Sequence, residues 1–188
     1  MLPTCYFNIE VRGAHVEGFG GACVWALQRT IGALHPTFKE HSDRYAMDLP
    51  VMRTSRSGGI RKLGHIVRVF CADNEAAELL ANRLESNEAL RDLVMIGRTK
   101  VFDANSYAGP WVTLRRFRVA PRMQPDNRKR DLALGDALPF VRTRSATNGN
   151  GYTLMFMRQR VNRNGDEGTP NSYGLSGAIP THLPDLGG

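Results

Sequence analysis

The first hundred residues alternate between short stretches typical of strands and longer stretches typical of helices. "CYFNIEVR" alternates apolar and polar residues, as a half-buried strand does. "GACVWALQRTIGALHP" places Val24, Leu27, Ile31 and Leu34 at helical spacing, and we expect Pro36 to end this helix. "RYAMDLP" and "GHIVRVFCA" have the composition of a second and a third strand.

A second helix and a fourth strand complete the pattern. "DNEAAELLANRL" begins with Asp73 as a candidate N-cap, has Glu75 near its positive end and places Leu80 and Leu84 on one stripe. "EALRDLVMIGRTKVF" can finish this helical region and supply a strand. The resulting order, β-α-β-β-α-β, is that of ferredoxin-like (RRM-like) domains, and we assign such a domain to residues 1–100.

The rest of the chain, residues 101–188, is richer in turns. "GPWVTLRRFRVAP" predicts a strand between two prolines, and "PRMQPDNRKRDLALGD" predicts a basic, proline-interrupted connector. "VRTRSATNGNGYTLMFMRQ" predicts a β-hairpin, and "NGDEGTPNSYGLSG" leads into a loose tail. We therefore expect an α+β protein whose second, smaller α+β domain is basic.

The positive charge is confined to the second half of the chain. The net charge is +7; residues 1–97 hold 11 basic and 11 acidic residues, whereas residues 98–188 hold 14 and 7. Arg outnumbers Lys 21 to 4, which codon usage in a GC-rich genome would explain, but codon usage does not explain why acids thin out in one half only. A polyanionic partner, nucleic acid before membrane, is the leading inference.

Several classes of protein do not fit this sequence. No run of about 18 apolar residues is present, and the N-terminus lacks the basic start and apolar core of a secretion signal, so we expect a cytoplasmic protein with no membrane partner. Cys5, Cys23 and Cys71 have no CxxC spacing and are expected to be buried thiols in a reducing compartment. The five histidines show no zinc spacing, so we expect no metal and no cofactor.

The predicted hairpin carries more polar chemistry than a turn needs, because two residues suffice to reverse a strand. Ser145 and Thr147 lie within its loop region, and Tyr173 follows later, but no Asp/Glu–His arrangement or G-x-S-x-G motif accompanies these hydroxyls. The chain also lacks a phosphate-binding P-loop. If the protein is an enzyme, we expect it to use neither a protein nucleophile nor a metal.

RNA supplies its own nucleophile, the 2′-OH beside the scissile phosphate. A protein then needs a base, an acid and groups that hold the geometry. His35, at the expected end of the first helix, is the best candidate for proton transfer; alternatively, it only interacts with the helix dipole. Arg116 and Arg118 are two residues apart and share one strand face, where they either contact nucleic acid or keep an edge strand soluble, while Arg115 points the other way.

"LPFVRTRSATNGNGYTLMFMR" followed by "SYGLS" resembles the CRISPR-associated endoribonuclease of type I-F systems, which cuts the CRISPR RNA precursor at each repeat hairpin. "GALH" followed by "DRYAMDLP" is similar to the family's helix end and second strand, and "WVTLRRFRV" to its strand of major-groove contacts. The resemblance covers nearly the whole chain in order and spacing. Its most specific part is the C-terminal "YGLS" together with "LPF" and the "RS" that follows.

The resemblance implies the roles of the site residues. His35 falls on the catalytic histidine, Ser145 on the serine that orients the 2′-OH, and Tyr173 on the tyrosine that restrains the histidine. Tyr152 occupies the place of an aromatic residue that stacks beneath the terminal base pair of the RNA stem. Thr147, where Ser is usual, keeps a hydroxyl beside the phosphate, together with Arg144.

The resemblance also implies where the RNA stem is held. Arg116 and Arg118 occupy two strand positions that read purines in the major groove. The second is commonly Gln, so Arg118 predicts a preference for guanine, which changing that base pair would test. The family commonly has a long arginine-rich helix, which the prolines of "PRMQPDNRKRD" make us expect to be lost here. Phosphate contacts in this segment then fall to Arg122, Arg128, Lys129 and Arg130.

The implied reaction needs no metal and leaves a 2′,3′-cyclic phosphate and a 5′-hydroxyl. The nuclease then remains on its CRISPR RNA as a subunit of the type I-F interference complex, in contact with the other subunits. One alternative is a subunit that binds the hairpin without cutting it, although His35, Ser145 and Tyr173 together argue against this. A generic RRM-like binder is a third reading, but "CYFNIEVR" and "GHIVRVFCA" lack its Gly/aromatic pattern.

Overall fold

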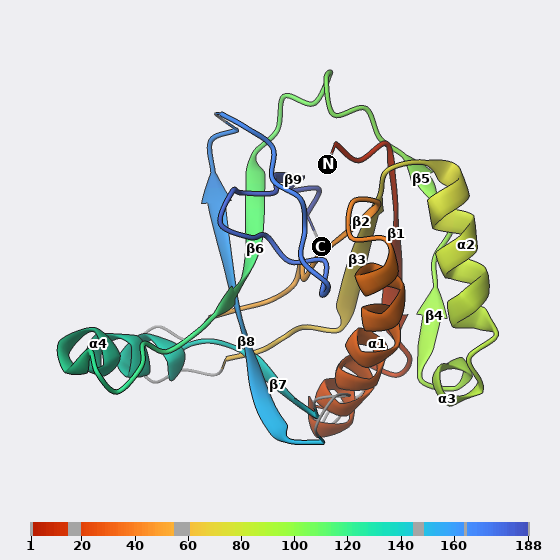
Figure 1. Ribbon diagram of the computed structural model, residues 1–188. Coiled ribbons are helices and arrows are strands. Elements are labelled where there is room, and N and C mark those ends of the chain that lie inside the picture. The colour runs from red at the N-terminus through yellow and green to blue at the C-terminus, as the bar shows by residue number, and fades with distance from the viewer. Residues whose placement is uncertain (1, 15–19, 55–60, 145–148, 164, 188) are drawn as a thin grey trace.

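The computed structural model of the 188-residue chain describes residues 2–14, 20–54, 61–144, 149–163 and 165–187. Two antiparallel sheets and several helices form the described part, which confirms the predicted α+β class (Figure 1). None of the helices in these segments has the length and apolarity needed to cross a bilayer.

The first sheet is formed by the N-terminal half of the chain. Its strands follow the order β2-β3-β1-β4, with every neighbouring pair antiparallel, and a short strand, β5, also pairs with β1. The side chains of β1 alternate between buried and half-buried, as predicted, whereas every residue of β3 is buried. The bounds are β1 Cys5–Val11, β2 Tyr45–Asp48, β3 Ile66–Cys71, β4 Val94–Ile96 and β5 Lys100–Val101.

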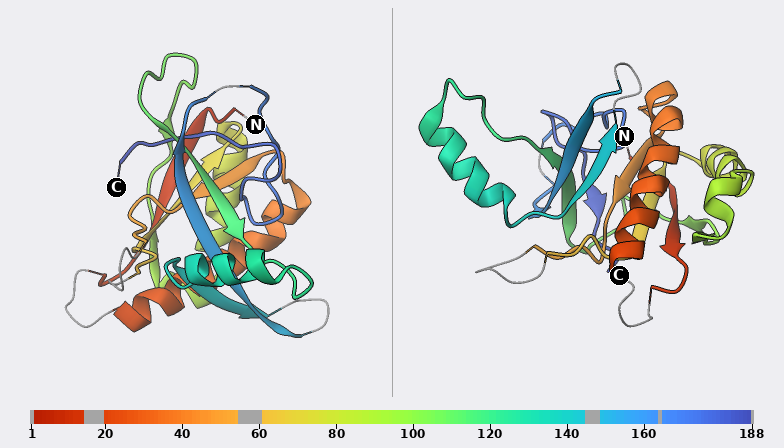
Figure 2. Two further views of the ribbon diagram at one scale, coloured as in Figure 1. Left: turned by 90° about the vertical axis from the view of Figure 1, so that its left-hand side faces the viewer. Right: turned by 90° about the horizontal axis from the view of Figure 1, so that it is seen from below.

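Three helices accompany this sheet and complete the expected order β-α-β-β-α-β. They are α1 Gly20–Glu40, α2 Asn74–Glu85 and the short α3 Glu88–Arg91. The predicted cap is confirmed, because Asp73 Oδ1 accepts a hydrogen bond from the backbone N–H of Ala76 at 2.8 Å. One side of α1 packs on the first sheet, and another contacts β7 of the second sheet (Figure 2).

The first helix departs from the prediction at Pro36, which lies inside α1 instead of ending it. Proline removes one backbone hydrogen bond and crowds the carbonyl four residues earlier. That carbonyl belongs to Gly32, and the final turn is nevertheless held by Thr37 and Phe38, both buried. His35 therefore lies more than one turn before the end of the helix, not at its C-terminus.

The apolar stripe of α1 is narrower than predicted. Leu27, Ile31 and Leu34 are buried, but Val24 is 39% exposed. Val24 lies at the edge of the stripe, where the helix surface turns away from the sheet.

The second sheet is formed by the C-terminal half, with the order β7-β8-β6-β9 and antiparallel pairing throughout. The predicted strand and hairpin are both present. The tail is not loose as expected, because Thr181, His182 and Leu183 are buried and β9 pairs with β6. The bounds are β6 Trp111–Phe117, β7 Phe140–Arg144, β8 Gly151–Val161 and β9 Leu183–Pro184.

The expected proline-interrupted connector contains a helix, α4, which spans Pro125–Gly135. Pro125 occupies the first helical turn, where its missing N–H would have had no partner and its fixed φ suits the helix. The prediction failed because proline was taken as a breaker without regard to its position. The helix stands away from both sheets as an arm (Figures 1 and 2).

Both halves share one hydrophobic core. A single cluster contains Phe7 and Leu34 from the first half and Leu114, Leu154 and Phe156 from the second. The division into domains 1–100 and 101–188 therefore stays a prediction.

A buried ion-pair network also joins the two sheets. Arg158 on β8 donates to both carboxylate oxygens of Asp48 on β2, at 2.8 and 2.9 Å, and to Asp185 at 2.8 Å. Asp48 is fully buried. Burial alone would lower the pKa of Arg158, but the two carboxylates raise it above its ordinary value. Losing one partner of such a network leaves an uncompensated buried charge, at a cost of about 3–5 kcal/mol.

Candidate active site

His35 is held in one orientation by the C-terminal segment. Its ring stacks on that of Tyr173, with centroids 4.0 Å apart and planes 5° from parallel. Its Nδ1 lies 2.6 Å from the backbone oxygen of Ser172. A carbonyl oxygen only accepts, so Nδ1 carries the proton and donates it. In the neutral ring the lone pair is then on Nε2, which is the atom available for proton exchange.

Tyr173 connects His35 to the hairpin. Its hydroxyl forms a hydrogen bond with the hydroxyl of Tyr152, near the start of β8. Burial, followed by the hydrogen bond and charge of Tyr152, raises the pKa of Tyr173 to about 12, although Arg116 acts in the opposite direction. The phenol therefore stays protonated at neutral pH, which suits a residue that positions His35 and not one that acts as a base.

Arg116, near the end of β6, extends the cluster by one further group. Its guanidinium carbon lies 5.3 Å from the centroid of the Tyr152 ring, a cation–π contact. Its Nε is buried and has no hydrogen-bond partner among the residues that the structure describes. An unpartnered buried donor on a cation is expensive, and an anionic oxygen would satisfy it.

The segment that carries Tyr173 is attached to both sheets. The backbone N–H of Met47 on β2 donates to the oxygen of Gly174 at 2.9 Å, and the N–H of Ser176 donates to Leu114 on β6 at 2.8 Å. Within the segment, Asn171 Oδ1 accepts from the N–H of Tyr173 at 2.8 Å. The tyrosine is thus fixed by backbone contacts on each side of it.

Gly174 allows this attachment. Its φ is +68°, and a Cβ at this position would lie 2.5 Å from the ring of Phe38 and 3.1 Å from the N of Met47. A larger residue would be strained by its backbone and would also displace the segment from the core.

The structure brings together some of the predicted site residues. His35, Tyr152 and Tyr173 form one continuous cluster, and Arg116 joins it. Ser145 and Thr147 lie outside the described residues. Arg144 pairs with Gly151 in the β7–β8 ladder.

The remaining predicted residues lie elsewhere. Arg115 donates to the oxygen of Gly177 at 3.2 Å and so helps to hold the C-terminal segment. Arg118 is exposed and follows the last residue of β6, so it does not share the strand with Arg116 as expected. The other basic residues are on or just before the α4 arm, away from His35: Arg122, Arg128, Lys129 and Arg130.

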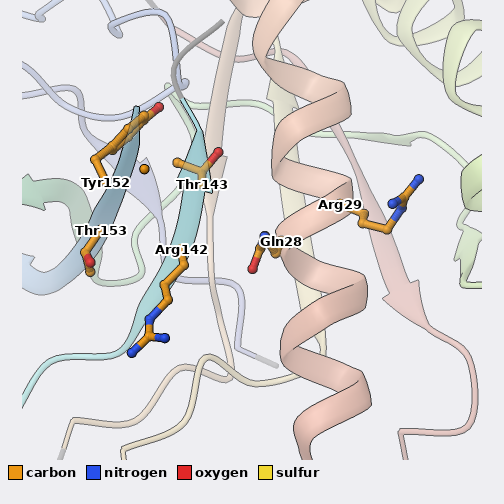
Figure 3. Close-up of a pocket in the computed structure, with 7 residues that line it drawn as sticks. Gln28, Arg29, Arg142, Thr143, Tyr152 and Thr153 are labelled. Carbon is orange, nitrogen blue, oxygen red and sulfur yellow. The ribbon is translucent and has the colours of Figure 1, made fainter. Parts of the chain in front are cut away.

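An open groove adjoins the cluster between α1 and the hairpin, with a volume of about 580 Å³. Gln28 of α1 faces Thr143 and Arg142 of β7 across it, whereas Arg29 extends outward from the helix (Figure 3). Sequence reasoning missed this groove; the available signal was that Gln28 precedes His35 by seven residues, or two helical turns. The lining residues are Gln28, Arg29, Arg142, Thr143, Gly151, Tyr152 and Thr153.

No three His, Cys, Asp or Glu side chains in the described segments are grouped so that they could hold a metal ion. The groups that the cluster offers for chemistry are an imidazole, two phenols and a guanidinium.

No family model and no curated protein matches the sequence. Among solved structures, a crystal structure provisionally assigned as a chlorite dismutase is similar over 82% of this chain and 79% of its own, with 11% sequence identity and a TM-score of 0.32. A sequence identity and a TM-score this low give no information about what the chain does.

Proposed function

We propose that the protein is a metal-independent endoribonuclease that binds the stem-loop of CRISPR repeat RNA and cuts the precursor at the base of the stem. The observation that carries this proposal is the cluster of His35, Tyr173, Tyr152 and Arg116, four residues from distant parts of the chain. The resemblance to the type I-F nuclease implies that three of them, His35, Tyr152 and Tyr173, share a site.

The cluster suits a reaction in which RNA supplies the nucleophile. The 2′-oxygen forms a bond to the adjacent phosphorus, and the bond from phosphorus to the 5′-oxygen breaks. The 2′-OH loses a proton and the departing oxygen gains one, which gives a 2′,3′-cyclic phosphate and a 5′-OH. Because Nδ1 of His35 is held by the Ser172 carbonyl, Nε2 exchanges these protons whether the ring begins neutral or charged.

The neighbouring groups support the geometry of that step. Tyr173 holds the imidazole plane, and the guanidinium of Arg116 places a positive charge beside Tyr152, where it stabilises the phosphate. Arg116 covers one face of Tyr152, so the terminal base pair of the stem stacks on the other. Ser145, Thr147 and Arg144 keep the roles that the resemblance implies, beside the 2′-OH and the phosphate.

Under this proposal, each of the two sheets forms a domain with its own role. The first sheet and its helices form a ferredoxin-like domain, and the second sheet with α4 forms the RNA-recognition domain. The excess of basic over acidic residues after position 97, 14 against 7, supports this division. Arg115 and Arg118 border the stem, the α4 arm contacts its phosphates, and the protein remains on the product as a subunit of the interference complex.

Cleavage of a repeat stem-loop RNA in EDTA tests the proposal. The intact RNA should be cut, and an RNA with a 2′-deoxy nucleotide just upstream of the cut should be bound but left whole. Binding without cleavage of either RNA would identify a non-cleaving subunit instead. Cleavage that requires Mg²⁺ would contradict the proposal.

A further inference from the structure

The groove between α1 and the hairpin leads directly to the proposed active site. Tyr152 belongs to both, since it lines the groove and bonds to Tyr173. On α1, Trp25, Gln28, Gly32 and His35 recur at intervals of three and four residues and so lie along one stripe of the helix. From His35 to Gln28 the stripe rises by about 10 Å.

The stripe leaves a path open beside the helix. A Cβ added at Gly32 would meet no atom of the described residues within 4 Å, so the helix surface is open at this point between His35 and Gln28. Trp25, farther along, is 49% exposed, although large aromatic side chains are usually buried. An exposed indole at the end of an open path offers a surface on which a planar group can stack.

Two arginines lie along this path, Arg142 in the groove and Arg29 on the outward side of α1 (Figure 3). Arg29 and Arg142 form no salt bridge and no side-chain hydrogen bond with any residue that the structure describes. The guanidinium carbon of Arg29 lies 5.2 Å from the Trp25 ring centroid. The hydroxyls of Thr143 and Thr153 complete the polar lining. Exposed aromatic rings interleaved with arginine are typical of surfaces that hold single-stranded nucleic acid.

We propose that the unpaired RNA strand on the 3′ side of the cut runs along this groove and over α1, with one phosphate on Arg142 in the groove, a base on Trp25 and another phosphate on Arg29, both on the outward side of the helix. This inference rests on the proposed function. The nucleotide with the departing 5′-oxygen must lie at Nε2 of His35, where the stripe begins. The opposite strand leaves the stem on the other side of the terminal base pair, a duplex width away from α1.

The groove therefore distinguishes the precursor from the product. Cleavage separates the 3′ flank from the stem. The released flank then binds only through the few contacts in the groove and therefore binds weakly. The groove contacts therefore increase the affinity for uncut RNA but do not affect how tightly the cleaved stem-loop is retained.

The test compares RNAs that differ only in their flanks. The full-length His35→Ala protein is titrated with a stem-loop RNA that has no flank, an unpaired 3′ flank or an unpaired 5′ flank, and Kd is measured by fluorescence anisotropy. We expect the 3′ flank to lower Kd by about 5- to 100-fold, the effect of one stacked base. The slope of log Kd against log salt should also steepen by about 1.4, since two phosphate contacts on a single strand contribute roughly 0.7 each.

Variants identify the residues involved. Adding Trp25→Ala, or Arg29→Gln with Arg142→Gln, should reduce the ratio of flankless to 3′-flanked Kd toward one, and the arginine pair should also abolish the extra salt dependence. Arg91→Gln, on exposed α3, is the matched control and should leave the ratio unchanged.

Three results would overturn the inference: a ratio of one in the His35→Ala background, a flank effect that the variants do not alter, or an effect of the 5′ flank alone. Cleavage of the stem-loop RNA by the wild-type protein is measured in parallel. If cleavage occurs and the flank adds nothing, only the groove inference fails. If the stem-loop RNA is neither bound nor cut, the proposed function fails and the groove inference fails with it.

Discussion

The cluster around His35 and the α4 arm are both rich in polar side chains, but they are held in opposite ways. Each ring of the cluster contacts another member, and the segment that carries Tyr173 is bonded to both sheets. In α4, by contrast, Gly135 at the C-terminal end is the buried residue, and the N-cap, Gln124, makes no capping hydrogen bond from its side chain.

The arm is held mainly by its own neighbours in sequence. Arg128 donates to the oxygen of Ala120 at 3.1 Å, and Asp131 accepts from the N–H of Ala120 at 3.0 Å. Lys129 and Arg130 remain exposed. The difference teaches that proton transfer requires fixed geometry, whereas phosphate binding requires accessible charge that can adjust to its partner.

The largest effect that would test this contrast is expected at His35. His35→Ala should lower the single-turnover cleavage rate by about 100- to 10,000-fold, the usual contribution of a proton-transfer group, and leave RNA affinity within twofold. His41→Ala, just beyond the end of α1, is the control. A parallel loss of affinity would mean that His35 supports the fold and not the chemistry.

Gly174→Ala should have the next largest effect, because the new Cβ would overlap the Phe38 ring at a residue of positive φ. We expect the free energy of unfolding, measured by urea denaturation, to fall by about 2–4 kcal/mol, and cleavage to slow as Tyr173 shifts. Gly165→Ala has a φ of +89° but open space around its Cβ, so it should show the backbone cost alone, about 1–2 kcal/mol. Equal effects would show that the contact with Phe38 is unimportant.

Removing charge from the α4 arm should have a smaller effect, on RNA affinity and not on the cleavage rate. Lys129→Gln with Arg130→Gln should weaken stem binding and reduce its salt dependence by about 0.9 for each lost phosphate contact. The cleavage rate of bound RNA should not change. A drop in that rate of about 100-fold or more, the lower end of the usual contribution of a proton-transfer group, would show that the arm also shapes the active site.

Acid should produce the smallest of these changes at Asp185, in the ion-pair network that joins the two sheets. Burial alone would raise the pKa of Asp185, but the hydrogen bond and charge of Arg158, with Arg160, hold it below its ordinary value. The stabilisation from this carboxylate is therefore present above about pH 4 and lost as the pH falls through the folded-state pKa. Urea denaturation from pH 6 to pH 2 would measure the loss, which Asp185→Asn should reduce and Asp166→Asn should not.

The sequence predicted those features of the fold that local chemistry determines. The alternation of β1, the Asp73 cap and the β7–β8 hairpin all followed from spacing and side-chain type. The two prolines were misjudged because their effect depends on context: Pro125 lies in the first turn of a helix, and Pro36 is tolerated because Phe38 anchors the turn after it.

The site was less accessible to sequence reasoning. His35 is a candidate from its own chemistry and position, but only the family resemblance groups it with Tyr152 and Tyr173, since no local pattern joins residues so far apart. The contact of Arg116 with Tyr152 depends on the register of β6 against β8, which pairs Arg116 with Phe156. The groove depends on the approach of α1 to β7, a tertiary contact that spacing along the chain does not encode.

The position of Tyr173 near the end of the chain also has a consequence for synthesis. A ribosome completes α1 long before it reaches Ser172 and Tyr173, so a nascent or prematurely terminated chain contains His35 without the carbonyl and the ring that orient it. Under the proposed function, such a chain could hold RNA before it could cut it. Under the same proposal, catalytic competence arises only after the surfaces that select the RNA have been made, because His35 is oriented by residues translated long after α1.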